Sequence, residues 1–403
     1  VVITDTLMFL LFTFVAFFAL MFLVGEAGGL RSAVDGLARL PEKSGLMSWT
    51  GIVGEDAPFQ SGLHFALWNV TLALAWGLVY AVSPWQSSRY LVARSEHVAI
   101  RAACIAAVCL AFLEVTLYLG GAVVNLWDAN IDPPHQVMIF AARDLLPPIL
   151  GAGLLAGIMA AALSSASTFL SLVGFSVSND LFPHRTGDEA QLLRWSRWTM
   201  LGVGLVALAI AFPAPVDLFW LTYFVGTLFA SSWGPVALMS VWSRRITADA
   251  AFWGIVSGFV FNAGPKGLVT LGWLSLPYWL DPVLLGALVS LGVVLFVSRR
   301  GAPTREEVRY RLRMHRTPAE ELEPRQVRRT RRLPFLLVVY AVGISTLFAL
   351  TYLPAYRAAT GESARAEAIL LAIGPILWTF TAVMAWWVIG RSYGLRPRAE
   401  TNS

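Results

Sequence analysis

The chain has 403 residues, of which 57% are hydrophobic and 14% are charged, whereas a soluble chain is nearer half apolar and a quarter charged. Its mean hydropathy of +0.65 excludes an ordinary soluble protein. The net charge of +5 does not indicate nucleic-acid binding, because the arginines lie mostly in short loops between apolar runs, and the two cysteines are too few for a disulfide framework or a metal site.

Apolar runs of about twenty residues, the length that crosses a bilayer, recur along the chain. They predict an all-α, multi-pass protein of the cell (plasma or inner) membrane. The ten predicted spans are 7–24, 63–84, 98–124, 148–178, 194–212, 217–242, 248–265, 281–298, 333–353 and 367–389. Because the chain opens with Val1-Val2-Ile3, without Met or a signal-peptide pattern, we expect a fragment that lacks its N-terminus.

The distribution of arginine predicts the orientation of the spans. If Val1 starts in the cytoplasm, the arginine-rich loops all fall on the cytoplasmic side, as the positive-inside rule requires. The densest run extends from Arg299 to Arg332 and includes several glutamates, so parts of it are predicted to be amphipathic helix. We interpret it as a solvated cytoplasmic linker touching anionic lipid, with a regulatory or partner site as the alternative.

The second predicted span contains an aromatic pair and two residues that weaken a helix. Trp76 and Tyr80 are four residues apart and share a helix face, and Gly77 and Pro84 lie beside them. One interpretation is an interfacial aromatic belt or plain packing. The other is a broken helix whose aromatic side chains form the wall of a substrate site, with Asn69 as a weaker polar candidate.

Glu114 lies within the third predicted span, in the segment CLAFLEVTLYLGG. An ionisable residue inside the membrane is a functional candidate, and here the hypothesis is ion or proton coupling. The alternatives are a structural hydrogen bond to Tyr118, one turn later, or a position nearer the interface.

The most informative segment is Gly151–Asp180, which is long enough to span a bilayer as one helix. Every fourth residue is small, in a ridge made of Gly153, Gly157, Ala161 and Ser165. Beside it lies a stripe of hydroxyl groups from Ser164, Ser165, Thr168 and Ser171. The ridge and the stripe are explained either by close helix packing or by a site for a hard cation, which prefers oxygen ligands. In the second case Ala161 can offer its carbonyl only where the helix is loosened.

This segment resembles the sodium-ligating helix of the sodium/solute symporter family, the proline, pantothenate and sugar symporters. The resemblance rests on Ala161-Ala162-Leu163-Ser164-Ser165, on the ending Asn179-Asp180-Leu181-Phe182, and on Trp76, Gly77, Tyr80 and Pro84 in the second span. It implies that Ala161 gives its carbonyl, and Ser164 and Ser165 their hydroxyls, to one sodium ion. It also implies a substrate site at Trp76, Tyr80 and Pro84, to which the span itself adds Asn69 as the weaker polar candidate. Trp85 stands where the family often has His, so the resemblance does not specify the solute.

The resemblance implies an inverted-repeat transporter fold of five plus five helices, of the broken-helix type, lacking most of the first repeat. Residues 1–25, with Thr4-Asp5 at their start, would be the last helix of that repeat, 26–62 an external loop and 63–243 the second five-helix repeat. Residues 244–299 would be peripheral helices, 300–332 the arginine-rich cytoplasmic linker, and 333–403 two extra C-terminal helices and a tail.

The function that follows is sodium-coupled symport, in which a small organic solute is imported by alternating access. No nucleophile elbow, Walker loop or zinc helix is present, so we expect no enzyme and no cofactor beyond sodium as coupling ion. The expected partners are sodium ion, a small organic solute and the lipid bilayer, with no nucleic acid. The alternatives are a membrane sensor or regulatory module built on a transporter fold, and a uniporter or a proton-coupled carrier using Glu114.

Overall fold

The computed structural model describes residues 2–43, 45–55, 57, 59–181, 189–212, 218–277 and 279–394, and all the regular elements among them are helical. These residues form two compact units. Unit 1 comprises Val1–Ala27 and Leu113–Tyr223, and unit 2 comprises Gly28–Phe112 and Phe224–Ser403. Each unit is described by itself below. Phe182, the last residue of the predicted sodium-helix motif, lies outside the described residues.

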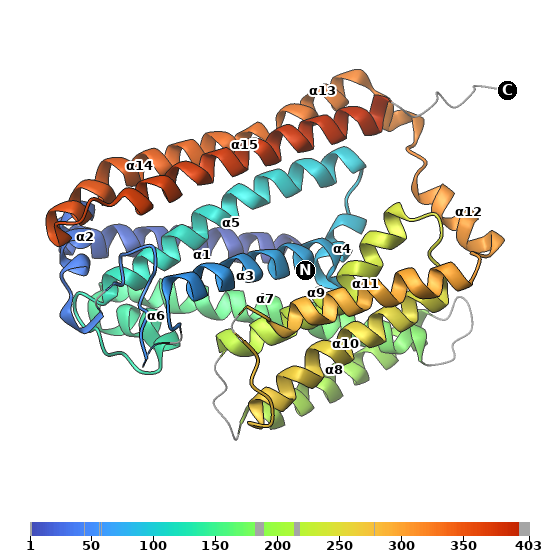
Figure 1. The fold of residues 1–403 in the computed structure, drawn as a ribbon, viewed down its shortest axis with the longest axis horizontal. Helices are drawn as coiled ribbons and strands as arrows, with labels where there is room; N and C mark the ends of the chain where they lie inside the picture. Colours follow the sequence, from blue (N-terminus) through green and yellow to red (C-terminus); the bar gives the residue numbers. More distant parts are fainter. Residues whose placement is uncertain are drawn as a thin grey trace. The chain divides into compact units, whose positions relative to one another are not determined.

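Within the described part of the chain, eight helices are long and apolar enough to cross a membrane (Figure 1). They are α1 (Val2–Glu26), α3 (Gly62–Val82), α5 (Glu96–Val124), α7 (Pro148–Asp180), α9 (Leu218–Trp242), α11 (Pro282–Arg300), α14 (Phe335–Thr360) and α15 (Arg365–Gly394). The other two predicted spans form α8 (Glu189–Ala211) and α10 (Ala248–Thr270), each of 23 residues. Both are of spanning length, but neither is apolar enough to be counted with the eight.

Helix α7 is the central element of unit 1, with α1 and α8 packed against it. Glycines of α7 permit both contacts. A Cβ at Gly157 would lie 2.6 Å from the Phe12 ring of α1, and one at Gly174 would lie 2.7 Å from Met200 of α8. The structure therefore confirms close packing for the first part of the predicted ridge.

The second part of that ridge is different. Ala161 and Ser165 continue the four-residue spacing, yet both are exposed. Packing against α1 therefore explains the small residues at the start of α7 and leaves these two unexplained. The rest of unit 1 includes the short helices η2 (Pro134–Gln136), α6 (Val137–Phe140) and η3 (Ala141–Leu145), which lead into α7.

In unit 2 the closest helix contacts are made by small residues of α9, α10 and α11. Gly258 of α10 faces the backbone of α9, where an added Cβ would lie 2.5 Å from the carbonyl oxygen of Ser231. The Ser231 hydroxyl donates to the Gly258 carbonyl (3.3 Å) and accepts from the Asn262 side chain (2.9 Å). These bonds satisfy buried polar groups inside the membrane and fix the separation of the two helices.

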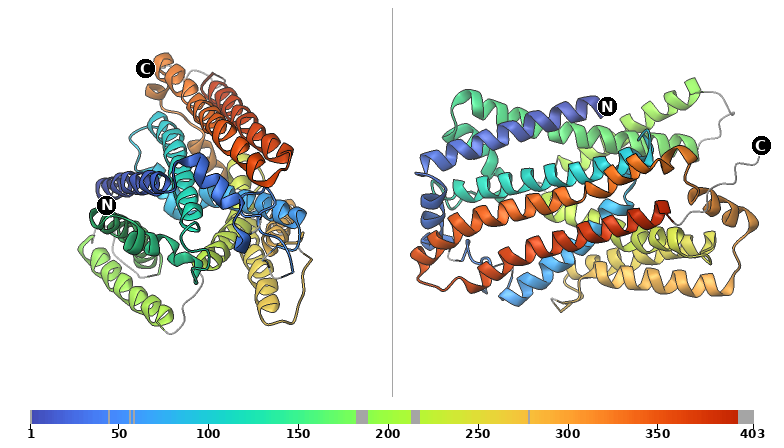
Figure 2. Two further views of the ribbon diagram at one scale, coloured as in Figure 1. Left: turned by 90° about the vertical axis from the view of Figure 1, so that its left-hand side faces the viewer. Right: turned by 90° about the horizontal axis from the view of Figure 1, so that it is seen from above.

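The C-terminal helices α14 and α15 run side by side (Figure 2). Helix α2 (Leu30–Ala38) packs against α14, and the Tyr352 hydroxyl donates to the Met47 carbonyl. The predicted external loop 26–62 thus contains a short helix, with η1 (Pro41–Lys43) after it, and is held by contacts to α14.

The predicted arginine-rich linker is partly helical, as its mixed charges indicated. It forms α12 (Arg305–Met314), η4 (Ala319–Leu322) and α13 (Pro324–Arg332). At the start of α12 the Thr304 hydroxyl accepts from the Glu307 N–H (3.2 Å), and the Glu307 carboxylate accepts from the Thr304 N–H, which completes a capping box. The same carboxylate accepts from the Ala248 N–H (2.7 Å), just after the N-cap of α10.

The Glu307 cap predicts a local pH dependence. The backbone N–H groups of Thr304 and Ala248 lower the pKa of Glu307, so its stabilising contribution is present at neutral pH and is lost as the pH falls through that lowered pKa. In hydrogen exchange corrected for intrinsic rates, we expect the amides of 304–308 to lose protection as the pH falls below the ordinary pKa of a glutamate carboxyl. Glu307→Gln should lack this transition, whereas Glu306→Gln should retain it. A transition that survives in Glu307→Gln would contradict the assignment.

Candidate functional site

The hydroxyl pair of α7 contacts a carboxylate from the start of α1. The Ser164 hydroxyl donates to the Asp5 carboxylate with an Oγ–Oδ1 distance of 2.9 Å. Both side chains are half-buried, and Ser165 beside them is exposed. Within unit 1 the structure therefore brings together hydroxyl and carboxylate oxygens, the ligands that hard cations prefer.

Asp5 was not among the predicted sodium ligands. In the sequence prediction, Thr4-Asp5 only marked the start of the first helix. An acidic residue inside an apolar segment was the available signal, because such residues mark functional sites in membranes. Its partner could not be inferred, since Ser164 lies 159 positions away along the chain.

Ser171 of the predicted stripe, and Ser167 one turn before it, are hydrogen-bonded within α7. The Ser167 hydroxyl donates to the Ser164 carbonyl (2.9 Å), and the Ser171 hydroxyl donates to the Ser167 carbonyl (2.6 Å). Both are thus satisfied within α7 itself. Helix α7 is regular through Ala161. The loosening that would free the Ala161 carbonyl as a ligand is therefore not seen in this conformation.

In unit 2, the predicted substrate residues of α3 share one helix face. Asn69, Trp76 and Tyr80 are spaced by seven and four residues on an unbroken helix. The rings of Trp76 and Tyr80 lie 5.9 Å apart between centroids. Trp76 is half-buried against α9, where its ring would lie 3.5 Å from a Cβ at Gly226, and Tyr80 is 44% exposed. Packing therefore explains much of Trp76, whereas Tyr80 is the more exposed member of the pair.

Asn69 makes a local hydrogen bond. Its side-chain amide donates to the Phe65 carbonyl of the preceding turn (2.9 Å), and the residue is exposed. This bond satisfies one donor of the amide.

The predicted helix break lies at Pro84 and not at Gly77. Helix α3 continues through Gly77 and ends at Val82, and Ser83 is extended, with φ −65° and ψ 140°. Pro84 then occupies the first turn of α4 (Pro84–Leu91). Gly77 does not interrupt the helix, because glycine lowers helix propensity without preventing the hydrogen bonds, whereas proline restricts the preceding residue to extended backbone.

The sequence model of the sodium:solute symporter family matches residues 1–258 of this chain. The chain belongs to the sodium:solute symporter family. The matched region contains every candidate site residue described above, and α11 to α15 lie beyond it. The predicted recognition of the family is confirmed, as is the multi-pass cell-membrane location.

Relatives of known description agree with this family. The sodium/proline symporter of Salmonella typhimurium is 29% identical over 261 residues, covering 62% of this chain and 50% of the relative. The sodium/proline symporter of Escherichia coli is 28% identical and also covers 62% of this chain and 50% of the relative. The high-affinity proline transporter PutP of Bacillus subtilis is 28% identical over 56% of this chain and 48% of the relative. The chain spans about half the length of these relatives. The family and these relatives are symporters, a class of transporter and not of enzyme.

Glu114 has an isolated position on α5. It is exposed, and among the described residues it has no hydrogen-bond or ion-pair partner. The alternative bond to Tyr118 is therefore not formed. The coupling role of this carboxylate within an apolar helix stays a prediction.

Proposed function

We propose that the protein containing this chain is a sodium-coupled symporter that imports a small organic solute by alternating access. The observation that carries the proposal is the contact between Ser164 and Asp5 in a chain of the sodium:solute symporter family. Because the relatives named above are sodium/proline symporters and a proline transporter, proline is the first solute to test.

The geometry suggests how sodium would be held. A hydroxyl that donates its hydrogen to a carboxylate turns its lone pairs away from that carboxylate. The Ser164 oxygen is thus free to accept a cation beside the Ser165 hydroxyl, with the Ala161 carbonyl as a third ligand once α7 loosens there. The Asp5 charge lies close enough to attract the ion without requiring direct coordination.

Sodium would act on transport by stabilising one conformation. An ion shifts a conformational equilibrium only through contacts that differ between the states. Ligands at Ser164, Ser165 and Ala161 would favour the state in which α7 is held against its partner helices. The solute would then bind beside Tyr80 and Trp76, and occupancy of both sites would permit closure and release to the inside.

The test is solute uptake by the full-length protein reconstituted in liposomes. We expect an inward sodium gradient to drive proline uptake, with a potassium gradient as the matched condition. A panel of other amino acids and small carboxylic acids identifies the solute if proline is not taken up. Uptake driven by a proton gradient and indifferent to sodium would overturn sodium coupling and favour Glu114. No uptake of any solute under either gradient would favour a sensor.

The substrate face of α3 makes a separate prediction. Tyr80→Ala should raise the solute concentration for half-maximal uptake by about tenfold, equivalent to about 1.4 kcal/mol, while the sodium dependence remains. Tyr90→Ala is the matched control, because Tyr90 is an exposed tyrosine of α4 that lies off this face. An equal effect of the two substitutions would contradict a substrate role for Tyr80.

A further inference from the structure

One face of α13 carries four arginines at three- and four-residue spacing, and we call them the arginine stripe: Arg325, Arg328, Arg329 and Arg332. All four are exposed. None of them has a hydrogen-bond, ion-pair or ring partner among the residues that the structure describes. Four like charges that form no ion pair with any described residue favour an anionic ligand from outside the chain.

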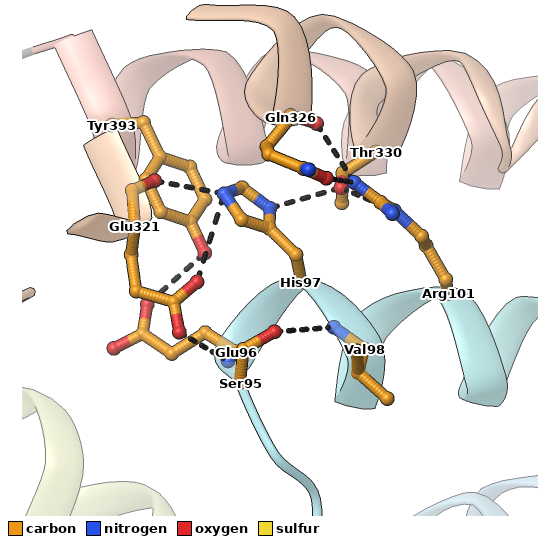
Figure 3. A network of polar contacts seen from close by, with 9 residues as sticks. All are labelled: Ser95, Glu96, His97, Val98, Arg101, Glu321, Gln326, Thr330 and Tyr393. Atoms are coloured by element: carbon orange, nitrogen blue, oxygen red, sulfur yellow. Dashed lines mark hydrogen bonds and ion pairs between the residues drawn. The ribbon is translucent and has the colours of Figure 1, made fainter. Parts of the chain in front are cut away.

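The opposite face of α13 fixes the direction of the stripe. Thr330 is fully buried, and its hydroxyl accepts from Arg101 Nε (2.9 Å) and lies 2.9 Å from His97 Nδ1 of α5 (Figure 3). Arg331 lies over the Trp386 ring of α15, 4.0 Å from its centroid. These contacts fix the rotation of α13 about its own axis. In that orientation the arginine stripe points away from α5 and α15.

The arginine stripe continues into an apolar surface. Leu333 and Pro334 keep right-handed helical backbone, so the face of α13 runs on into α14. Leu336 and Val339 extend it, and Val339 is 69% exposed. The stripe and these two residues line one groove of about 580 Å³. The groove is charged at one end and apolar at the other. A phospholipid has the same arrangement, with a charged headgroup joined to apolar acyl chains.

The length of the α13–α14 segment places the stripe at the membrane surface. Pro324–Thr360 has 37 residues. A helix of that length extends about 55 Å, and the hydrocarbon core is about 30 Å thick, so one end projects beyond it. Because arginine is unfavourable in hydrocarbon, the projecting end is α13. The positive-inside rule puts that end on the cytoplasmic side.

We propose that the arginine stripe, with Leu336 and Val339, binds an anionic phospholipid of the cytoplasmic leaflet. The guanidinium groups bind the phosphate, for which their planar donors are suited, and one acyl chain lies along the exposed face of α14. This site lies entirely in unit 2, beyond the family-matched residues, and does not depend on the transport activity proposed above.

The test measures lipid binding to the full-length protein, delipidated in detergent and examined by native mass spectrometry. We expect dioleoyl phosphatidylglycerol to bind at least about tenfold more tightly than dioleoyl phosphatidylcholine. Changing all four stripe arginines to Gln should abolish this preference. The matched control changes four exposed linker arginines of and after α12 to Gln: Arg305, Arg309, Arg313 and Arg316. It removes the same charge and should leave the preference intact.

Two further measurements separate the contributions of charge and of apolar surface to lipid binding. The double variant Leu336→Ser and Val339→Ser keeps all four charges and should weaken phosphatidylglycerol binding, which decides the matter if the charge variant does not fold. Glycerol 3-phosphate should not displace the bound lipid at equal concentration, because it lacks an acyl chain. Equal loss in the control, equal binding of the two lipids, or displacement by glycerol 3-phosphate would each overturn the proposal.

Discussion

Replacing Ser164 and Ser165 together by Ala is expected to weaken sodium binding by at least about a hundredfold, because each contact of a hydroxyl with a charged group contributes about 1.5–3 kcal/mol. Sodium-driven uptake in liposomes should be lost at sodium concentrations that saturate the unchanged protein. The substitutions leave α7 helical, since Ala has the highest helix propensity. The sodium concentration for half-maximal uptake is the quantity to measure.

The same helix offers a matched control for this prediction. Ser167→Ala with Ser171→Ala also removes two hydroxyls, but both of these donate to carbonyls of α7 itself. We expect that variant to retain its sodium dependence. Asp5→Asn should give an intermediate loss, since it removes the charge beside Ser164 and keeps an acceptor. Sodium-dependent uptake that survives in the Ser164/Ser165 variant would eliminate this site.

The second large effect is a loss of stability, which we expect when the close contact between α9 and α10 is disturbed. In Gly258→Ala the new Cβ would lie 2.5 Å from the Ser231 carbonyl oxygen and 2.7 Å from the Ser232 Cα, so backbone must move. Overpacking of this kind destabilises by about 1–3 kcal/mol, and the displacement also strains the bond between Asn262 and Ser231. We expect a lower melting temperature in detergent and faster hydrogen exchange in α10.

Gly267→Ala is the control for the Gly258 prediction, because it makes the same substitution in the same helix. Apart from its chain neighbours and the local helix backbone, no heavy atom of the described residues lies within 4 Å of a Cβ placed at Gly267. Alanine is about 1 kcal/mol better than glycine in a helix interior, so this variant should melt at the same temperature or higher. A similar loss of stability in both variants would show that helix propensity, and not the close contact, decides the outcome.

The sequence predicted what depends on local pattern. The apolar length of Gly151–Asp180 indicated a spanning helix, and its glycine spacing indicated the close packing that α1 makes at Gly157. The Trp76–Tyr80 pairing followed from helix geometry alone. The sequence analysis named both Gly77 and Pro84 as residues that weaken the helix. The break between α3 and α4 lies at Pro84, and the helix continues through Gly77.

Contacts between distant segments could not be predicted. Neither Asp5 with Ser164 nor Thr330 with His97 has any periodic signal in the sequence, because each pair lies more than 150 positions apart. The sequence analysis also predicted spans at α8 and α10, which have the spanning length but are less apolar than the other eight described helices. The inverted repeat, the domain boundaries and the ligand roles of Ala161, Ser164 and Ser165 stay predictions.

The polar network around His97 connects α5 with helices from the C-terminal part of the chain. His97 and Arg101 lie in the family-matched residues, whereas Glu321, Thr330 and Tyr393 lie beyond them. His97 Nε2 lies 2.8 Å from the Glu321 carbonyl oxygen, and its ring stacks on Tyr393 at 4.8 Å between centroids. Breaking these buried contacts would leave polar groups unsatisfied. These contacts bond the N-terminal end of α5 to α13 and to the end of α15. The family-matched part of the chain is thereby tied to helices that lie beyond the match.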